Sequence, residues 1–178
     1  NLLNAAAALA TGLQLGFNAP DLLQGLYVFH GTGRRFEVKG TVHGVRVIDD
    51  YGHHPTEIDA TLKAARRFAD GGRLIVIFQP HRFTRTVAFA QRFADSLSKA
   101  DRIIVLEIYA ASEKPIMGVS SQLITGLMEN GEYIPNFVEA TDSVIDSAQP
   151  GDVIVTLGAG DVSSLGPIIV DGLIRRFG

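Results

Sequence analysis

The sequence contains no cysteine, and this absence excludes several kinds of site. Disulfide bonds, zinc–cysteine sites and cysteine nucleophiles all require a thiol, and a chain without one fits a reducing compartment. No apolar run approaches the length of a membrane span. The net charge is −3, so the chain also lacks the basic excess that is typical of a nucleic-acid-binding surface.

A phosphate-binding motif of the form G-x-x-x-x-G-K-[ST] is absent as well. The glycine-rich stretch Gly158-Ala159-Gly160-Asp161 follows an apolar strand and precedes a helix, but it lacks the full G-x-G-x-x-G spacing. Two interpretations stay open for it. It is either a phosphate loop or a tight turn in which Asp161 caps the next helix.

The residues that are present indicate a globular α/β protein, with 46% hydrophobic and 20% charged residues. Apolar residues recur at helical and strand spacing in alternation, which predicts a Rossmann-like, mainly parallel sheet with helices on both faces. Two further helices are expected first, at 2–15 and 20–29, before a break at Gly31-Thr32-Gly33. In the α/β part, we expect helices at 56–69, 84–98, 120–130, 143–148 and 162–176, and strands at 74–78, 102–106, 133–137 and 152–157.

A β-hairpin is expected ahead of these repeats, because β-branched residues at even spacing flank a two-residue turn at His43-Gly44. With that turn, Glu37 faces Asp50. Arg35 and Asp50 are therefore expected to meet at the open end of the hairpin. A one-residue slip in register would weaken this inference.

Polar residues follow the second hairpin strand, at the edge where open α/β sheets bind ligands. They are Asp49, Asp50, Tyr51, His53 and His54. A metal site made by them alone is disfavoured, because adjacent strand residues point to opposite faces. The alternatives are a helix cap with exposed histidines and, favoured here, a loop that contacts a ligand.

A second cluster, His81, Arg82 and Arg85, stands at the amino end of a predicted helix, where the helix dipole disfavours cations. No acid lies within residues 79–86. An anionic ligand held by arginine forks, a phosphate or a carboxylate, resolves this conflict. Solvated arginines, or arginines paired with distant acids, are the alternative. The long segment 107–118 has the length of a lid, but nothing in it fixes a chemistry.

Four stretches resemble the Mur ligase family, in matching order and over essentially the whole chain. The run Gln79–Arg85 favours members that join L-alanine to UDP-N-acetylmuramate over ligases that add later residues. The murein peptide ligase, which shares the Asp-Asp-x-x-His-His-Pro core, is the close alternative. The four stretches are Asn1–Ala6, Arg34–Phe36, Asp49–Ile58 and Phe78–Thr86.

The resemblance implies a fragment of a three-domain, cytoplasmic enzyme of peptidoglycan synthesis. Residues 34–178 resemble its Rossmann-like C-terminal domain, and residues 1–33 the last helices of the central ATP-binding domain. The implied cofactors are ATP and Mg²⁺, and the implied partners are UDP-N-acetylmuramate, L-alanine and the remaining domains, with no nucleic acid or membrane. Because the P-loop lysine and the Mg²⁺ ligands lie outside residues 1–178, the fragment alone is expected to be inactive.

The family reaction proceeds through an acyl phosphate of the muramate carboxylate, which the amine of L-alanine then attacks. The resemblance assigns a catalytic role to His53 as well as to two arginines. A free-standing, non-catalytic nucleotide- or anion-binding module is the alternative from a different class. The implied nucleotide-site residues are Asn1, Arg35 and Asp50, and those near the reacting groups are Tyr51, His53, Arg82 and Arg85.

Overall fold

The computed structural model describes residues 2–29, 31–69 and 71–178, and the chain divides into two compact units at residues 32 and 33. The first unit is a pair of helices, α1 (Leu2–Gln14) and α2 (Ala19–Val28). Asn18 begins α2, because its side chain accepts a hydrogen bond from the Asp21 backbone N–H at 2.9 Å. Both predicted helices are present, with ends within a residue of those expected.

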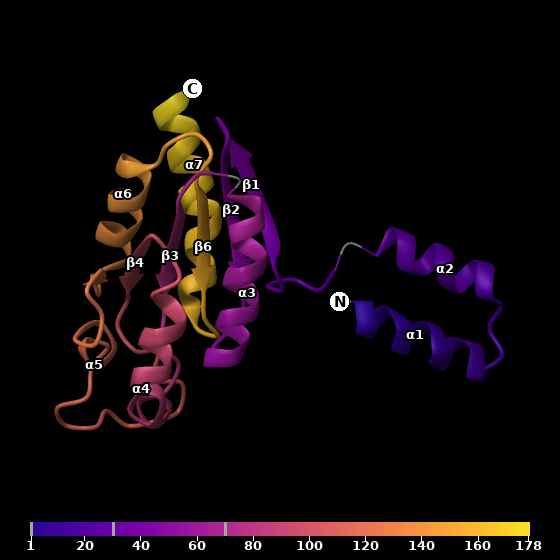
Figure 1. Ribbon diagram of the computed structural model, residues 1–178, viewed down its shortest axis with the longest axis horizontal. Coiled ribbons are helices and arrows are strands. Elements are labelled where there is room, and N and C mark those ends of the chain that lie inside the picture. Colours follow the sequence, from indigo (N-terminus) through magenta and orange to yellow (C-terminus); the bar gives the residue numbers. More distant parts are fainter. Residues whose placement is uncertain (1, 30, 70) are drawn as a thin grey trace. The chain divides into compact units, whose positions relative to one another are not determined.

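The second unit is a six-stranded sheet in the order β1-β2-β6-β3-β4-β5 (Figure 1). Only the β1–β2 pair is antiparallel, so the predicted Rossmann-like, mainly parallel sheet with an N-terminal hairpin is confirmed. The strands are β1 Glu37–Val42, β2 Val45–Asp50, β3 Leu74–Phe78, β4 Arg102–Val105, β5 Gly131–Tyr133 and β6 Val153–Leu157. The helices are α3 Pro55–Phe68, α4 Phe83–Leu97, α5 Gln122–Thr125, α6 Phe137–Ser147 and α7 Leu165–Phe177, the last preceded by a 3₁₀ turn, Asp161–Ser164.

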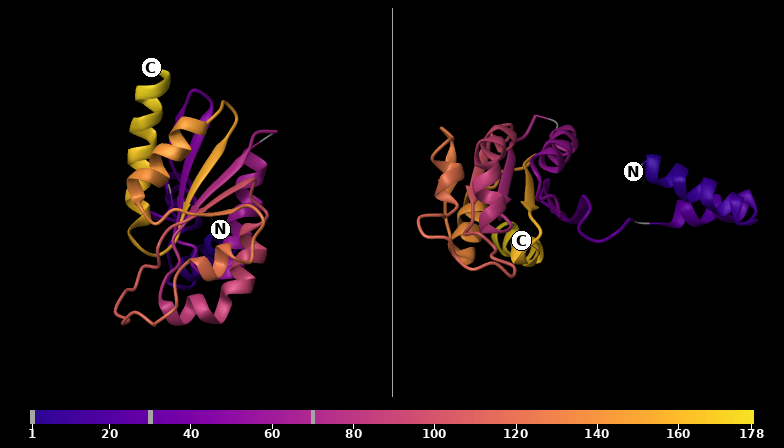
Figure 2. Two further views of the ribbon diagram at one scale, coloured as in Figure 1. Left: turned by 90° about the vertical axis from the view of Figure 1, so that its left-hand side faces the viewer. Right: turned by 90° about the horizontal axis from the view of Figure 1, so that it is seen from below.

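The sheet has a hydrophobic core on each face, because successive strand residues point to opposite sides. In β3, for example, Val76 packs in the core under α3 and α4, and Ile77 packs in the core under α6 and α7. The left panel of Figure 2 shows α6 and α7 on one side of the strands and α3 and α4 on the other. Burial of the central strands on both faces explains why β3 is apolar throughout and why β6 is apolar apart from Thr156.

The predicted register of the hairpin is wrong by one residue at its open end. Val42 faces Val45 as the turn requires, but a bulge at Lys39 makes Glu37 face Asp49 instead of Asp50. The bulge lies beside Gly40, where a side chain would come within 3.0 Å of Val170 on α7. Packing against α7, which turn geometry does not include, accompanies this change of register.

Three predicted elements near the C-terminal half are also corrected. The helix expected at 120–130 is only the single turn α5, which ends at Gly126. The strand expected at 133–137 lies earlier, at β5, because Asn136 caps α6 by accepting from the Val138 and Glu139 backbone N–H groups. As a result, α6 is eleven residues long and begins well before the expected 143.

The end of the sheet where the parallel strands begin is closed by an ion pair between a buried carboxylate and a partly exposed arginine. Asp152, only 2% exposed, accepts from the Arg73 side chain at 2.6 and 3.2 Å and from the Arg73 backbone at 3.1 Å. The same guanidinium donates to the Ser147 carbonyl at 2.6 Å. The pair therefore joins the start of β3 to the start of β6 and the end of α6.

We predict that Arg73→Ala lowers the free energy of unfolding by about 2–3 kcal/mol, because it leaves the Asp152 carboxylate buried without its cation. Urea unfolding followed by circular dichroism measures the change. Arg67→Ala is the matched control, since Arg67 is exposed and should change stability by less than about 0.5 kcal/mol. Equal stability of the two variants would contradict the structural role of the pair.

Candidate functional site

The candidate site lies at the edge of the sheet where the parallel strands end. Asp50, Leu157 and Phe78 are in register across β2, β6 and β3, so the loops that follow these strands start at one level. The chain after β4 joins them, because residues 81 and 109 form a short parallel bridge. This edge therefore gathers both polar clusters that the sequence singles out.

Arg34, a residue that sequence reasoning did not select, holds this edge together. Its Nη2 donates to the carbonyls of Gly158 and Gly160 at 2.6 and 3.1 Å, and its own carbonyl accepts from the Tyr51 N–H at 2.7 Å. Its Nε lies 3.4 Å from Oδ2 of the fully buried Asp49. The only signal for it in the sequence is its place beside Arg35 in the family stretch Arg34–Phe36.

Asp49 is buried in the sheet and does not face the loops. Burial raises the pKa of its carboxyl group, although the Thr156 hydroxyl, which donates to it at 2.8 Å, and the charge of Arg34 act in the opposite direction. Of the two adjacent acids, this one thus serves as the buried counter-charge of Arg34. No ligand-facing role remains for it.

The expected contact between Arg35 and Asp50 is not formed. The Asp50 carboxylate is 6% exposed and accepts from the backbone N–H groups of Phe36 and Gly52, both at 2.8 Å, and from the Thr61 hydroxyl at 3.0 Å. Arg35 is exposed, and among the described residues no carboxylate lies within 4 Å of it. Asp50 orders the loop, and the Arg35 guanidinium faces solvent.

Four aromatic rings from three loops form a continuous row along the edge, which we call the ring row. Tyr51 and His53 are 5.2 Å apart, His53 and His81 are 5.6 Å apart, and His81 and Tyr109 are stacked at 5.6 Å. The guanidinium of Arg35 lies over the outer ring, 5.4 Å from the Tyr51 centroid. The ring row thus joins the two clusters that the sequence placed on separate loops.

The two adjacent histidines have different tasks. Nδ1 of His53 lies 3.0 Å from the Tyr51 carbonyl, and because a carbonyl only accepts, this nitrogen carries a proton; in the neutral form of the ring, Nε2 is then the acceptor. His54 caps α3: its Nδ1 accepts from the Thr56 N–H at 3.3 Å, and Glu57 closes the capping box. The helix-cap interpretation is therefore confirmed for His54, and the ligand-loop interpretation stays a prediction for His53.

The second cluster is built around a strained start of α4. Arg82 has a φ of 72°, which L residues rarely adopt, and its N–H donates to the Tyr109 carbonyl at 2.8 Å. Its carbonyl accepts from the backbone and the hydroxyl of Thr86 at 3.1 and 2.8 Å. The distant Glu113 accepts from Thr84 in the same turn. A distant acid thus reaches this helix end, but it binds Thr84, and no pairing of Arg82 or Arg85 with an acid is formed within the described residues.

Two buried side-chain nitrogens beside this helix end are unpaired within the part of the chain that the structure describes, and one of them belongs to a guanidinium, which can only donate. Nη1 of Arg85 and Nδ1 of His81 are buried without a hydrogen-bond partner among the described residues. Burial, followed by the charges of His53, Arg85 and Arg82, lowers the pKa of His81, so its imidazole is neutral at neutral pH. A buried guanidinium nitrogen without a partner is costly, and a bound carboxylate or phosphate oxygen would satisfy it.

The glycine-rich turn after β6 is occupied by the protein itself. A side chain at Gly160 would collide with both Gln79 and Tyr109, and the turn's carbonyls accept from Arg34. Asp161 does not cap the next helix as expected, because its carboxylate accepts from the Gln79 amide at 2.7 Å. The turn therefore packs against Tyr109 of the ring row. These contacts favour the interpretation as a tight turn over that as a phosphate loop.

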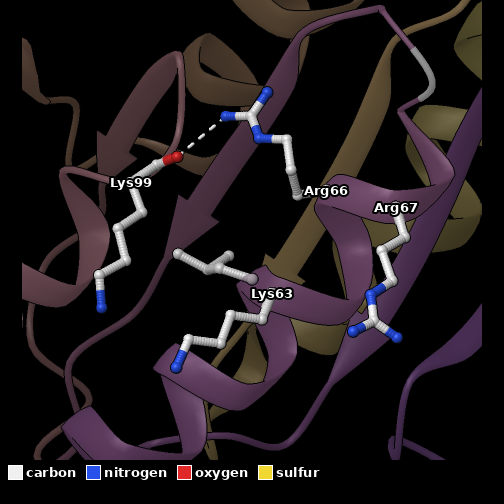
Figure 3. Close-up of a pocket in the computed structure, with 5 residues that line it drawn as sticks. Lys63, Arg66, Arg67 and Lys99 are labelled. Atoms are coloured by element: carbon white, nitrogen blue, oxygen red, sulfur yellow. Dashed lines mark hydrogen bonds between the residues drawn. The ribbon is translucent and has the colours of Figure 1, made fainter.

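A basic pocket of about 300 Å³ lies at the opposite edge, between the ends of α3 and α4 (Figure 3). Arg66 there donates to the Lys99 carbonyl at 2.9 Å and pairs with Asp101 at 2.6 Å, and Lys99 pairs with Asp59. Cations at the end of α3 are also favoured by its dipole. Local ion pairs and the dipole account for this cluster, so it is not the candidate site.

Three further points concern the adenine contact, metal binding and membrane spans. Asn1, the expected adenine contact, lies outside the described residues. Within 2–29, 31–69 and 71–178, no three histidine or acidic side chains gather closely enough to hold a metal ion. Over the same ranges, none of the helices combines the length and apolar character that a bilayer crossing requires.

The fold and the site together define a Rossmann-like domain in which cationic and aromatic side chains gather where the parallel strands end. Residues 34–160 match the family model described as "Mur ligase, glutamate ligase domain". The chain belongs to the Mur ligase family.

Relatives and solved structures extend this match over nearly the whole chain. The UDP-N-acetylmuramate–L-alanine ligase of Saccharopolyspora erythraea is 49% identical over 98% of this chain, and that of Paenarthrobacter aurescens is 50% identical over 97%. The crystal structure of the corresponding ligase of Thermotoga maritima superposes with a TM-score of 0.79 at 27% identity, over 99% of this chain and 38% of that one. The chain spans only 36–38% of the length of the two curated relatives.

We predict that Arg34→Ala destabilises the protein far more than Arg35→Ala, although the two residues are neighbours. Arg34→Ala leaves Asp49 buried without a cation and should lower the free energy of unfolding by about 3 kcal/mol. Arg35→Ala, the matched control, removes an exposed side chain and should change it by less than about 0.5 kcal/mol. Urea unfolding of both variants measures this; a larger loss for Arg35→Ala would overturn the assignment.

Proposed function

We propose that the chain is the C-terminal part of a cytoplasmic UDP-N-acetylmuramate–L-alanine ligase, an ATP-dependent enzyme of peptidoglycan synthesis. The observation that carries the proposal is the pair Arg82 and Arg85 beside His81, with a buried guanidinium nitrogen that has no partner among the described residues. The substrates of such a ligase are anions. The identity of about half the residues to two alanine ligases supports this choice of substrates.

In this proposal, the site divides into two halves along the ring row. Arg82 and Arg85 grip carboxylate or phosphate oxygens of the reacting groups, and Tyr51 lines the approach. His53 offers Nε2 to the ammonium of the incoming L-alanine, because an amine must lose a proton before it attacks. Catalysis by this domain would consist of positioning and charge neutralisation.

The proposed nucleotide contacts lie at the Tyr51 end of the ring row. ATP, when bound, supplies the phosphoryl group that activates the muramate carboxylate. Arg35 fits a role as its contact, since its guanidinium is exposed and rests over Tyr51. Asp50 fits a supporting role, because its bond to the Phe36 N–H orders the loop that presents Arg35. Direct contact of Asp50 with a ribose hydroxyl would use the lone-pair position that its three donors leave.

The proposal also assigns the two parts of the chain. Residues 1–33 are the last helices of a central ATP-binding domain, with Asn1 near the adenine, and residues 34–178 are the C-terminal domain. Mg²⁺ and its ligands, like the P-loop lysine, belong to the remainder of the ligase. The fragment alone is therefore expected to be inactive, because its arginines would have no activated carboxylate to act on.

Two alternatives make different predictions. A murein peptide ligase fragment would belong to an enzyme that accepts a peptide and not L-alanine as the incoming amine. A free-standing binding module would bind nucleotide or anion without turnover. Immunoblotting of the native cells against this domain separates the module from both ligases. A band of roughly 450 residues, the size of three domains, supports a ligase, and a band of this chain's size would remove catalysis.

We predict that Arg82→Ala or Arg85→Ala in the complete ligase lowers kcat/KM by about a hundredfold or more, because each removes a charged donor from the reacting oxygens. Steady-state phosphate release measures the rates, and circular dichroism verifies the fold. Arg67→Ala, a remote exposed arginine, should keep the wild-type rate. Full activity in both site variants would refute the assignment of the arginines.

A further inference from the structure

The long chain segment 107–118 is fixed to the start of α4 at two separate points. Nearer β4, the Tyr109 N–H donates to the Pro80 carbonyl and the Tyr109 carbonyl accepts from the Arg82 N–H, both at 2.8 Å. Further on, the Glu113 carboxylate accepts from the Thr84 backbone N–H at 3.0 Å and from its hydroxyl at 2.5 Å. Figure 1 shows this segment passing from β4 toward α5 beside α4.

Glu113 supplies the cap that α4 does not provide for itself. The residue at the N-cap position is Arg82, which makes no side-chain capping bond and whose φ of 72° is unfavourable for any residue with a side chain. Glu113 is 29 residues from Thr84 in the sequence, so the bonds between these two residues connect two separate loops. A carboxylate also complements the positive end of the helix dipole.

The charge of Glu113 is committed to this contact. Its bond from the Thr84 hydroxyl lowers the pKa of Glu113 most, followed by the backbone N–H groups of Thr84 and Phe83 and the charge of Arg82. Among the described residues, no carboxylate lies within 4 Å of the guanidinium of Arg82 or Arg85. Glu113 thus occupies the backbone donors of the helix end and leaves both guanidinium groups free for a ligand.

We propose that Glu113 is a positioning residue of the ligase, which fixes the first turn of α4 so that Arg82 and Arg85 face the reacting anion. Two features require such a fixture. The backbone of Arg82 is strained, and such a conformation persists only where the surrounding structure holds it in place. Arg85 comes directly after Thr84, so the bonds between Thr84 and Glu113 also fix the position of Arg85. The inference rests on the function proposed above, and it gives the segment 107–118 a task.

The test uses the full-length ligase with Glu113→Ala, Glu113→Gln and, as a control from the same segment, the exposed Lys114→Ala. Glu113→Ala should lower kcat/KM for L-alanine or UDP-N-acetylmuramate at least about tenfold, since small displacements of positioning groups have large effects. Its KM for ATP should stay within about twofold, because Arg35 lies at the far end of the ring row. Glu113→Gln should recover most of the loss, because its amide oxygen still accepts from Thr84. Lys114→Ala should match the wild type.

A double-mutant cycle separates positioning from general loss of structure. If Glu113 acts through the arginines, Glu113→Ala should cause little further loss in an Arg85→Ala background. Wild-type kinetics in Glu113→Ala, or an equal loss toward ATP, would overturn the inference while Arg82→Ala and Arg85→Ala still inactivate the enzyme. Wild-type activity of those two arginine variants would instead refute the proposed function itself.

Discussion

The contacts of the Arg34 guanidinium hold together the end of the sheet where the candidate site lies. It lies between the buried Asp49 of β2 and the carbonyls of Gly158 and Gly160 after β6, so that one side chain joins two neighbouring strand ends. Its backbone also fixes Tyr51, the first member of the ring row. The buried carboxylate of Asp49 is costly by itself, and the nearby charge of Arg34 offsets part of that cost. Arg35, one residue later, is consequently free to face a ligand.

The sequence was sufficient to predict the fold because hydrophobic periodicity decides most of it. β3 is apolar throughout, and β6 apart from Thr156, since helices cover both faces of the sheet, and the order of strands and helices follows from that pattern. Elements with weak periodicity were harder to place. The short α5 and the start of α6 are set by Gly126 and Asn136, which are local end signals.

The site was only partly predictable, for a related reason. The residue types and their common edge followed from the position of each loop after a strand. Contacts between loops did not: the bulge at Lys39 changed the partner of Asp50, and Glu113 reached α4 from a distant segment. Which of two adjacent residues points inward depends on such contacts, and this is why the sequence did not predict that Arg34 and Asp49 hold the strand ends together.

The ring row has a consequence for the glycine-rich turn beneath it. His53 follows β2 and His81 follows β3, yet β6 runs between these strands, and neighbouring strands are about 4.8 Å apart. The two rings are nevertheless only 5.6 Å apart, so they meet above the end of β6. The turn that leaves β6 lies against the same row, because a side chain at Gly160 would collide with Tyr109, the ring that stacks on His81. A side chain at this one position would therefore displace a ring that is contributed by a loop two strands away, after β4.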